Sequence, residues 1–140
     1  MTLNVVLDAW ALMSIVRREQ PAMGRVYGVL RDAEDGRAQV AMSVINVGEV
    51  YYHVARAFGM EDGDRLLAYV RRLAIAILPA TDERVMAAAR IKAKHRVSYA
   101  DAFAVAASEE LGGSVWTGDP ELIALGDLYR IEALRRDGAT

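Results

Sequence analysis

The strongest constraint on the fold is a set of short apolar runs that alternate with segments of helical periodicity. The run Leu3–Leu7 is short, apolar and β-branched, as is typical of a central strand that is buried on both faces. The same reasoning predicts further strands at 39–42, 74–78, 114–117 and 128–131, and helices at about 10–17, 21–35, 43–58, 62–73, 81–95 and 98–111, with a brief helix opening at 119–120. Strands that alternate with helices form a mostly parallel sheet covered by helices on both faces, so we predict an α/β fold with about 4–5 central strands.

Length and composition indicate one globular domain that spans residues 1–140. The chain has no cysteine, which excludes thiol catalysis, cysteine-ligated zinc and a disulfide framework and suits a reducing cytoplasm, where we expect the protein to act. Asp8 interrupts the apolar N-terminal stretch, and no apolar run approaches ~18–20 residues, so neither a signal peptide nor a membrane span is predicted. The formal net charge of −2 provides no general attraction to nucleic acid.

Four acidic residues stand at the junctions of predicted strands and helices, or on a helix near such a junction: Asp8, Glu49, Asp101 and Asp119. Ligands of open parallel sheets bind at the carboxyl ends of the strands, where Asp8 and Asp119 both fall. Two carboxylates about 4 Å apart repel each other by about 4 kcal/mol at an effective dielectric of about 20, so four acids gathered there need a counter-charge. Oxygen ligands without cysteine favour Mg²⁺ or Mn²⁺ over zinc, and the acids therefore predict a divalent-cation site.

Three of these acids also have a structural explanation as helix caps. Asp8 and Asp119 are favoured N-caps, and Asp101 follows Ser98 at the spacing of a capping box. Capping alone does not explain Asp101, because the segment 102–107 that follows it is almost without polar side chains. A helix of this kind is buried nearly all round, so Asp101 is buried with it. A buried acid needs a partner, which a cation would provide.

Glu49 has a different alternative, an ion pair on a solvated helix face. Asn46, His53 and Arg56 recur on the same face at steps of three and four residues, so Glu49 is placed to pair with His53 or Arg56. The two histidines, His53 and His95, are too far apart and too isolated for a ligand or catalytic pair, and we interpret both as structural or surface residues.

Taken together, the segments that carry the four acids resemble the PIN-domain ribonucleases, most closely the VapC type of toxin–antitoxin ribonuclease. The resemblance covers nearly the whole chain and is carried by SYADAFAVAAS (98–108), VWTGDPEL (115–122), INVGEVYY around Glu49 and VVLDAWALMS around Asp8. It implies a three-layer α/β/α fold in which Asp8 and Asp101 are the principal metal ligands and Glu49 and Asp119 complete the pocket. The residues implied to support these ligands are Thr117, Asn46 and Ser98.

The same resemblance implies an activity and partners. The protein would hydrolyse RNA phosphodiester bonds with water activated by Mg²⁺ or Mn²⁺, leaving a 3′-hydroxyl and a 5′-phosphate. It would be the toxin of a toxin–antitoxin pair, a homodimer inhibited by a small antitoxin that inserts a basic side chain among the acids. Two alternatives stay open: a PIN-type nuclease of RNA processing without an antitoxin, and a non-catalytic receiver-like α/β interaction module.

One position departs from the family pattern. The family often has a small polar residue just after its first Asp, whereas Ala9 and Trp10 follow Asp8 here, so a supporting hydrogen bond from that position is lost or supplied elsewhere. A haloacid-dehalogenase-type phosphotransferase is disfavoured, because it needs a second Asp where this chain has Trp10. Trp10 and Tyr51 are placed to stack on a base, but their apolar periodicity favours packing in the core or at a subunit interface.

A basic segment just before Ser98 is the candidate for RNA contact. Its cationic side chains are Arg90, Lys92, Lys94 and Arg96. Cations beside a metal site would suit a phosphate backbone, whereas an ordinary solvated helix end would also favour them through the helix dipole. Both interpretations stay open.

Overall fold

A computed structural model describes residues 2–137; Met1 and residues 138–140, which the predicted domain of residues 1–140 includes, lie outside the described residues. Its centre is a five-stranded sheet in the order β3-β2-β1-β4-β5, with every strand pair parallel. The strands are β1 (Leu3–Leu7), β2 (Ala38–Ser43), β3 (Ala76–Leu78), β4 (Ser114–Thr117) and β5 (Ile131–Ala133). The helices are α1 (Ala9–Val16), α2 (Ala22–Glu34), α3 (Val44–Phe58), α4 (Met60–Arg72), α5 (Asp82–Lys94), α6 (Tyr99–Leu111) and α7 (Pro120–Ile123).

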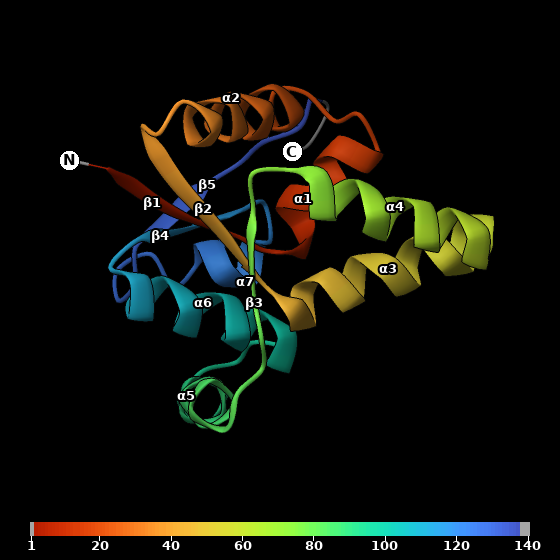
Figure 1. Ribbon diagram of the computed structural model, residues 1–140. Helices are drawn as coiled ribbons and strands as arrows, with labels where there is room; N and C mark the ends of the chain where they lie inside the picture. The colour runs from red at the N-terminus through yellow and green to blue at the C-terminus, as the bar shows by residue number, and fades with distance from the viewer. Residues whose placement is uncertain (1, 138–140) are drawn as a thin grey trace.

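The sheet is covered on both faces, as Figure 1 shows with α2 on one side and α5 and α6 on the other. Val5 and Leu7 of β1 lie in one buried cluster with residues of α1, α2 and α3, and Val6 lies in a second cluster with residues of α5 and α6. Successive side chains of a strand point to opposite faces, so a strand buried on both faces must be apolar throughout. The predicted three-layer α/β/α architecture is therefore confirmed.

The boundaries of two predicted strands are wrong. The last strand begins at Ile131, where the predicted strand 128–131 ends, because Leu128 and Tyr129 still donate backbone hydrogen bonds to Leu125 in a turn after α7. The third strand starts at Ala76 rather than at residue 74, because the N–H of Ile75 bonds the carbonyl of Leu73 and closes a turn there. Local turn hydrogen bonds compete with the ladder of an edge strand, and apolar content alone does not reveal them.

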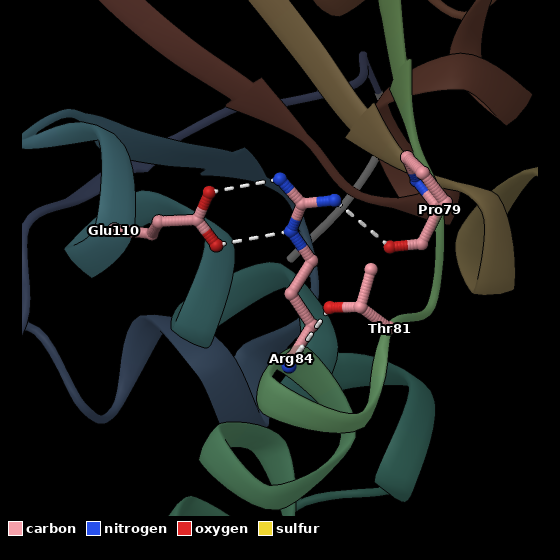
Figure 2. Close-up of polar contacts among 4 residues, drawn as sticks. All are labelled: Pro79, Thr81, Arg84 and Glu110. Carbon is pink, nitrogen blue, oxygen red and sulfur yellow. Dashed lines mark hydrogen bonds and ion pairs between the residues drawn. The ribbon is translucent and has the colours of Figure 1, made fainter.

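A guanidinium clamp fixes α5 against the end of α6 (Figure 2). Arg84 donates through Nε and Nη2 to the two carboxylate oxygens of Glu110, each at 3.0 Å, and through Nη1 to the carbonyl of Pro79 at 3.0 Å. Its own N–H donates to the hydroxyl of Thr81, the N-cap of α5, at 3.3 Å. The clamp ties the loop after β3 to the far end of α6 from Asp101. Among residues 2–137, no helix is both long enough and apolar enough to cross a membrane.

Candidate metal centre

The four predicted acids come together at the carboxyl edge of the sheet. β1 and β4 are neighbours, with Leu7 paired to Trp116, so Asp8 at the end of β1 lies close to the segment after β4 that carries Asp119. α3 and α6 bring Glu49 and Asp101 to the same place, and all four side chains line one hollow of about 170 Å³. Segments far apart in the sequence thus converge on a single acidic pocket.

Asp8 is an N-cap and is also the most deeply buried of these acids. Its Oδ1 accepts a hydrogen bond from the N–H of Ala11 at 2.9 Å, and the residue is only 1% exposed. Burial raises the pKa of Asp8 to about 7, against the opposing effect of hydrogen bonds with the Thr117 side chain and the Ala11 N–H. The capping explanation is correct but incomplete, because a cap alone does not require a carboxylate to give up its hydration.

Asp101 sits in the first turn of α6, whose N-cap is Ser98. The Ser98 hydroxyl accepts from the N–H of Asp101 at 3.0 Å, and Asp101 is 8% exposed. The pKa of Asp101 is raised to about 7, mainly by burial and then by a hydrogen bond with Asp119 and the charge of Asp119. Asn46 of α3 donates to the carbonyl of Ala100 at 3.0 Å and so ties this turn to the helix that carries Glu49.

Glu49 makes neither of the ion pairs that the sequence left open. No described ion pair joins it to His53 or Arg56; the guanidinium of Arg56 instead lies over the ring of Tyr52, 5.2 Å from its centroid. Its Oε1 is buried and has no hydrogen-bond partner among residues 2–137, and the same holds for Oδ1 of Asn46. A buried carboxylate oxygen without a partner is costly, so a ligand that binds it would relieve that cost.

Asp119 caps α7 and also faces Asp101. Its Oδ1 accepts from the N–H of Glu121 at 2.9 Å, while its own N–H donates to the hydroxyl of Thr117 at 3.0 Å. Carboxylate oxygens of Asp101, Asp119 and Glu121 lie within 4.8 Å of one another, a spacing at which a metal ion can be held. Sequence reasoning missed Glu121, whose position directly after Pro120 in a first helical turn was the available signal.

The remaining wall of the hollow comes mainly from α1. Trp10, Met13 and Arg17 line it, together with Glu19 and His53. Sequence reasoning did not place Arg17 there, although its spacing from Trp10 and Met13 puts the three on one helix face.

Trp10 is the second residue after Asp8, and its indole packs directly on the backbone at Gly118. A Cβ at Gly118 would lie 2.3 Å from two indole carbons, so only glycine fits under this ring. Trp10 also contacts the core cluster around Val5, which agrees with its interpretation as a packing residue.

The donor set of the acidic hollow fits a hard divalent cation. Most of its potential ligands are carboxylate oxygens, with His53 the one imidazole among its lining residues; the chain has no cysteine, and one buried oxygen of Glu49 lacks a partner among residues 2–137. A larger hollow of about 400 Å³ lies between β3, α5 and α6, but its floor is apolar, with Leu78, Phe103 and Ala106. Its Arg84–Glu110 pair is already satisfied, so the smaller hollow is the better candidate for chemistry.

None of the four cations predicted to contact RNA lines the acidic hollow: Arg90, Lys92, Lys94 and Arg96. The Nζ of Lys92 donates to the carbonyl of Val97 at 2.9 Å, where it stabilises the turn between α5 and α6. The other three side chains are exposed. Their contact with RNA stays a prediction.

The family comparison matches the PIN domain model over residues 5–128. No curated protein matches the chain significantly in sequence. Among solved structures, the chain is similar to VapBC2 from Rickettsia felis bound to a promoter DNA fragment, with a TM-score of 0.72 at 13% identity over 94% of this chain and 98% of that one.

Two further structures share the fold. VapC20 of Mycobacterium tuberculosis, a toxin that cleaves the sarcin–ricin loop, has a TM-score of 0.69 at 16% identity over 87% of this chain and 95% of that one. FitAcB from Neisseria gonorrhoeae has a TM-score of 0.63 at 21% identity over 91% and 96%, respectively. At these identities the similarity shows a common fold.

Proposed function

The chain belongs to the PIN-domain family, and on that premise we propose that it is a metal-dependent endoribonuclease that hydrolyses RNA phosphodiester bonds. The observation that carries the proposal is the acidic hollow itself. Four acids from separate elements line it, and one of them, Glu49, has a buried oxygen without a partner among residues 2–137. A receiver-like module without catalysis would not need a fourth acid held in this way.

In this proposal, Asp8 and Asp101 are the principal ligands of Mg²⁺ or Mn²⁺, and Glu49 and Asp119 complete the set. A bound ion of this kind lowers the pKa of water and stabilises negative charge on the leaving oxygen. The protein's part is to hold four carboxylates together. Because burial raises the pKa values of Asp8 and Asp101, these carboxyls hold protons more strongly than ordinary carboxyls, and binding of the ion would favour proton release.

Three neighbouring residues support the ligands. Thr117 connects Asp8 with Asp119, since its hydroxyl accepts from the Asp119 N–H and its side chain acts on the pKa of Asp8. Ser98 caps the turn that presents Asp101, and Asn46 holds that turn against α3. These contacts keep the carboxylates in place before the ion arrives, which spares the site the cost of ordering them.

We also propose that the protein is the toxin of a toxin–antitoxin pair and acts in the cytoplasm as a homodimer. Support comes from its structural neighbours, which include VapBC and FitAB-type complexes and a toxin that cleaves an RNA loop. A small antitoxin would inhibit it by placing a basic side chain among the acids. The alternative is a PIN nuclease that processes RNA without an antitoxin.

Cleavage of total RNA by the purified protein tests the nuclease proposal. The wild type should cut in Mg²⁺ or Mn²⁺ and stop in EDTA, with mapped ends carrying a 3′-hydroxyl and a 5′-phosphate. Asp8→Asn, Asp101→Asn and Glu49→Gln should each lose more activity than the roughly 10–100-fold typical of residues that only support a metal ligand. Glu109→Gln, an exposed acid of α6, is the matched control and should keep wild-type activity. Full metal-dependent cleavage by Asp101→Asn would refute the assignment.

Expression in a bacterial host tests the toxin proposal separately. The wild type should arrest growth, Asp101→Asn should not, and co-expression of a short upstream reading frame should restore growth. A cleaving protein that leaves growth unaffected would favour the alternative of RNA processing.

A further inference from the structure

Arg17 at the end of α1 and His53 of α3 line the acidic hollow, the exposed ring of Tyr52 packs against His53, and Arg56 lies over that ring. We call the surface formed by these four residues the mouth of the hollow. We infer that this mouth binds an unpaired segment of RNA, with Arg17 and Arg56 contacting phosphates and Tyr52 stacking on a base. The inference rests on the proposed nuclease function, which it deepens by naming the form of the substrate and the residues that hold it. It differs from the sequence-based expectation, which offered the end of α5 as the candidate for RNA contact.

The α1 side of the mouth presents Arg17 at the end of a helix face that leads into the hollow. Trp10 and Met13 precede it on this face, and all three line the hollow. Arg17 is exposed and forms no ion pair with any described residue. Its neighbour Glu19 does not neutralise it, because Glu19 is paired with Arg136 at 3.3 Å. A free guanidinium thus stands beside an acidic pocket.

The turn after α1 holds this arrangement with a strained residue. Arg18 has a φ of 55°, a left-handed conformation that glycine adopts more readily than arginine. The N–H of Arg18 donates to the carbonyl of Ile15 at 3.2 Å, and the N–H of Glu19 donates to the carbonyl of Ser14 at 2.9 Å. These two bonds end the helix at a defined point and fix where Arg17 and Glu19 leave it. Backbone strain of this kind is concentrated at functional sites.

The α3 side of the mouth presents an aromatic ring held by a cation. His53 lines the hollow one turn after Glu49, and its ring centroid lies 4.7 Å from that of Tyr52. Arg56 lies over the Tyr52 ring at 5.2 Å, and Tyr52 is still 44% exposed. Arg56 and His53 together reduce the freedom of the ring, and the exposed part of its surface is available for stacking.

This combination of groups suits unpaired RNA better than a duplex. Proteins that hold single strands place aromatic rings against bases and cations against the backbone, and a base inside a duplex has no free face to offer. The ligand acids also lie deep, with Asp8 1% and Asp101 8% exposed at the hollow of about 170 Å³. A phosphate must therefore pass the mouth to reach these acids. Arg17 and Arg56 offset the electrostatic repulsion between the phosphate and the acids.

Binding of a fluorescein-labelled oligouridine to the Asp101→Asn protein tests the inference without cleavage. Fluorescence anisotropy is measured against salt concentration in the presence of Mg²⁺. The pair Arg17→Gln/Arg56→Gln should weaken binding by roughly tenfold and lower the slope of log affinity against log salt by about 1.4, since each phosphate contact with a single strand contributes about 0.7. Tyr52→Leu should weaken binding roughly five- to hundredfold and leave the salt slope unchanged.

Two matched pairs of substitutions remove the same charge elsewhere. Arg31→Gln/Arg130→Gln acts at the opposite edge of the sheet, because Arg31 lies at the end of α2 before β2 and Arg130 precedes β5. Lys94→Gln/Arg96→Gln acts at the end of α5. Wild-type-like binding by the first pair and at most a small loss in the second support the inference. The inference would be overturned if the Arg31/Arg130 pair lost as much affinity as the Arg17/Arg56 pair, or if only the Lys94/Arg96 pair lost affinity. It would also be overturned if an RNA duplex bound as tightly as oligouridine and depended on Tyr52 in the same way.

Failure of this inference is separable from failure of the proposed function. If the wild type cleaves RNA with Mg²⁺ while the Arg17/Arg56 pair binds oligouridine normally, the nuclease stands and the mouth is not the RNA site. If that pair loses binding but the wild type never cleaves, the RNA site stands and the nuclease proposal fails.

Discussion

Removing the negative charge of a buried acid in the hollow should make the metal-free protein more stable, which is the opposite of the usual effect of a substitution in a buried site. Asp8→Asn keeps the helix cap, since asparagine caps as well as aspartate and can accept the same bond from the Ala11 N–H. It removes the negative charge that burial disfavours. Asp101→Asn does the same at the second of the two proposed principal ligands. Both substitutions should therefore stabilise the protein wherever the wild-type carboxylates are ionised.

The magnitude follows from the shifted pKa values. Each carboxyl moves from its ordinary 3.8 to about 7, and at 1.36 kcal/mol per unit this gives a ceiling of about 4 kcal/mol for each residue. Both groups line a hollow that admits water, and they interact with each other, so we expect about 1–2 kcal/mol for each substitution.

The effect of each substitution on the free energy of unfolding depends on pH. Below about pH 4 the carboxyl is protonated in both the folded and the unfolded protein. Between about pH 4 and pH 7 the folded protein keeps protons that the unfolded chain has released, so wild-type stability falls as pH rises. Above about pH 7 the loss is complete. The advantage of each Asn variant should accordingly be small near pH 4 and reach its full value above pH 7.

Urea unfolding at about pH 5 and about pH 8, in EDTA and in Mg²⁺, measures this. In EDTA the variants should exceed the wild type by a small margin at pH 5 and by the full amount at pH 8. In Mg²⁺ the order should reverse, because the wild type gains about 2.7 kcal/mol at a hundred times the dissociation constant and the variants gain less. Glu109→Gln, an exposed acid, should behave as wild type throughout. Wild-type stability that stays constant from pH 5 to pH 8, or variants that are less stable than wild type at pH 8 in EDTA, would refute the reasoning.

Two further predictions concern the packing of Trp10 on Gly118 and the ion pair between Arg84 and Glu110. Gly118→Ala should destabilise the protein by about 1–3 kcal/mol in urea unfolding, because the added Cβ would lie 2.3 Å from the Trp10 ring. Gly28→Ala is the control: this helical glycine has no atom within 4 Å of an added Cβ, so the substitution should be neutral or stabilising by up to about 1 kcal/mol. Glu110→Gln should cost less than about 1 kcal/mol, since its pair with Arg84 is partly exposed, and Mg²⁺ affinity measured by calorimetry should not change; a large loss of affinity would show that the clamp acts on the metal centre.

Much of the fold was predictable because its signals are local. The buried residues of β1, Val5, Val6 and Leu7, are all apolar, as a strand with helices on both faces requires. The caps Ser43, Thr81 and Ser98 each begin the helix that the sequence predicted. The alternation of strands and helices then required a parallel sheet. The errors fell on β3 and β5, the edge strands, where few residues pair and turn hydrogen bonds decide the boundaries.

The candidate site was predictable in its members but not in its arrangement. Asp8 and Asp119 stood at strand ends, and the apolar helix after Asp101 indicated that this acid is buried, as the structure finds. The sequence could not say whether Glu49 pairs with Arg56 or stays without a partner, because that depends on where the Tyr52 ring lies. It also gave no reason to place Arg17 beside the acids.

The sequence by itself therefore determined the elements, the layers and the identity of the acidic residues, since each of these depends on periodicity, capping and residue chemistry within a short segment. Only the tertiary structure decided that β1 lies next to β4, which brings Asp8 and Asp119 to one edge, and that Oε1 of Glu49 is buried without a partner among the described residues. Strand order and the burial of a single atom depend on contacts between distant segments. No local pattern encodes those contacts, and the acidic hollow and its mouth are made of them.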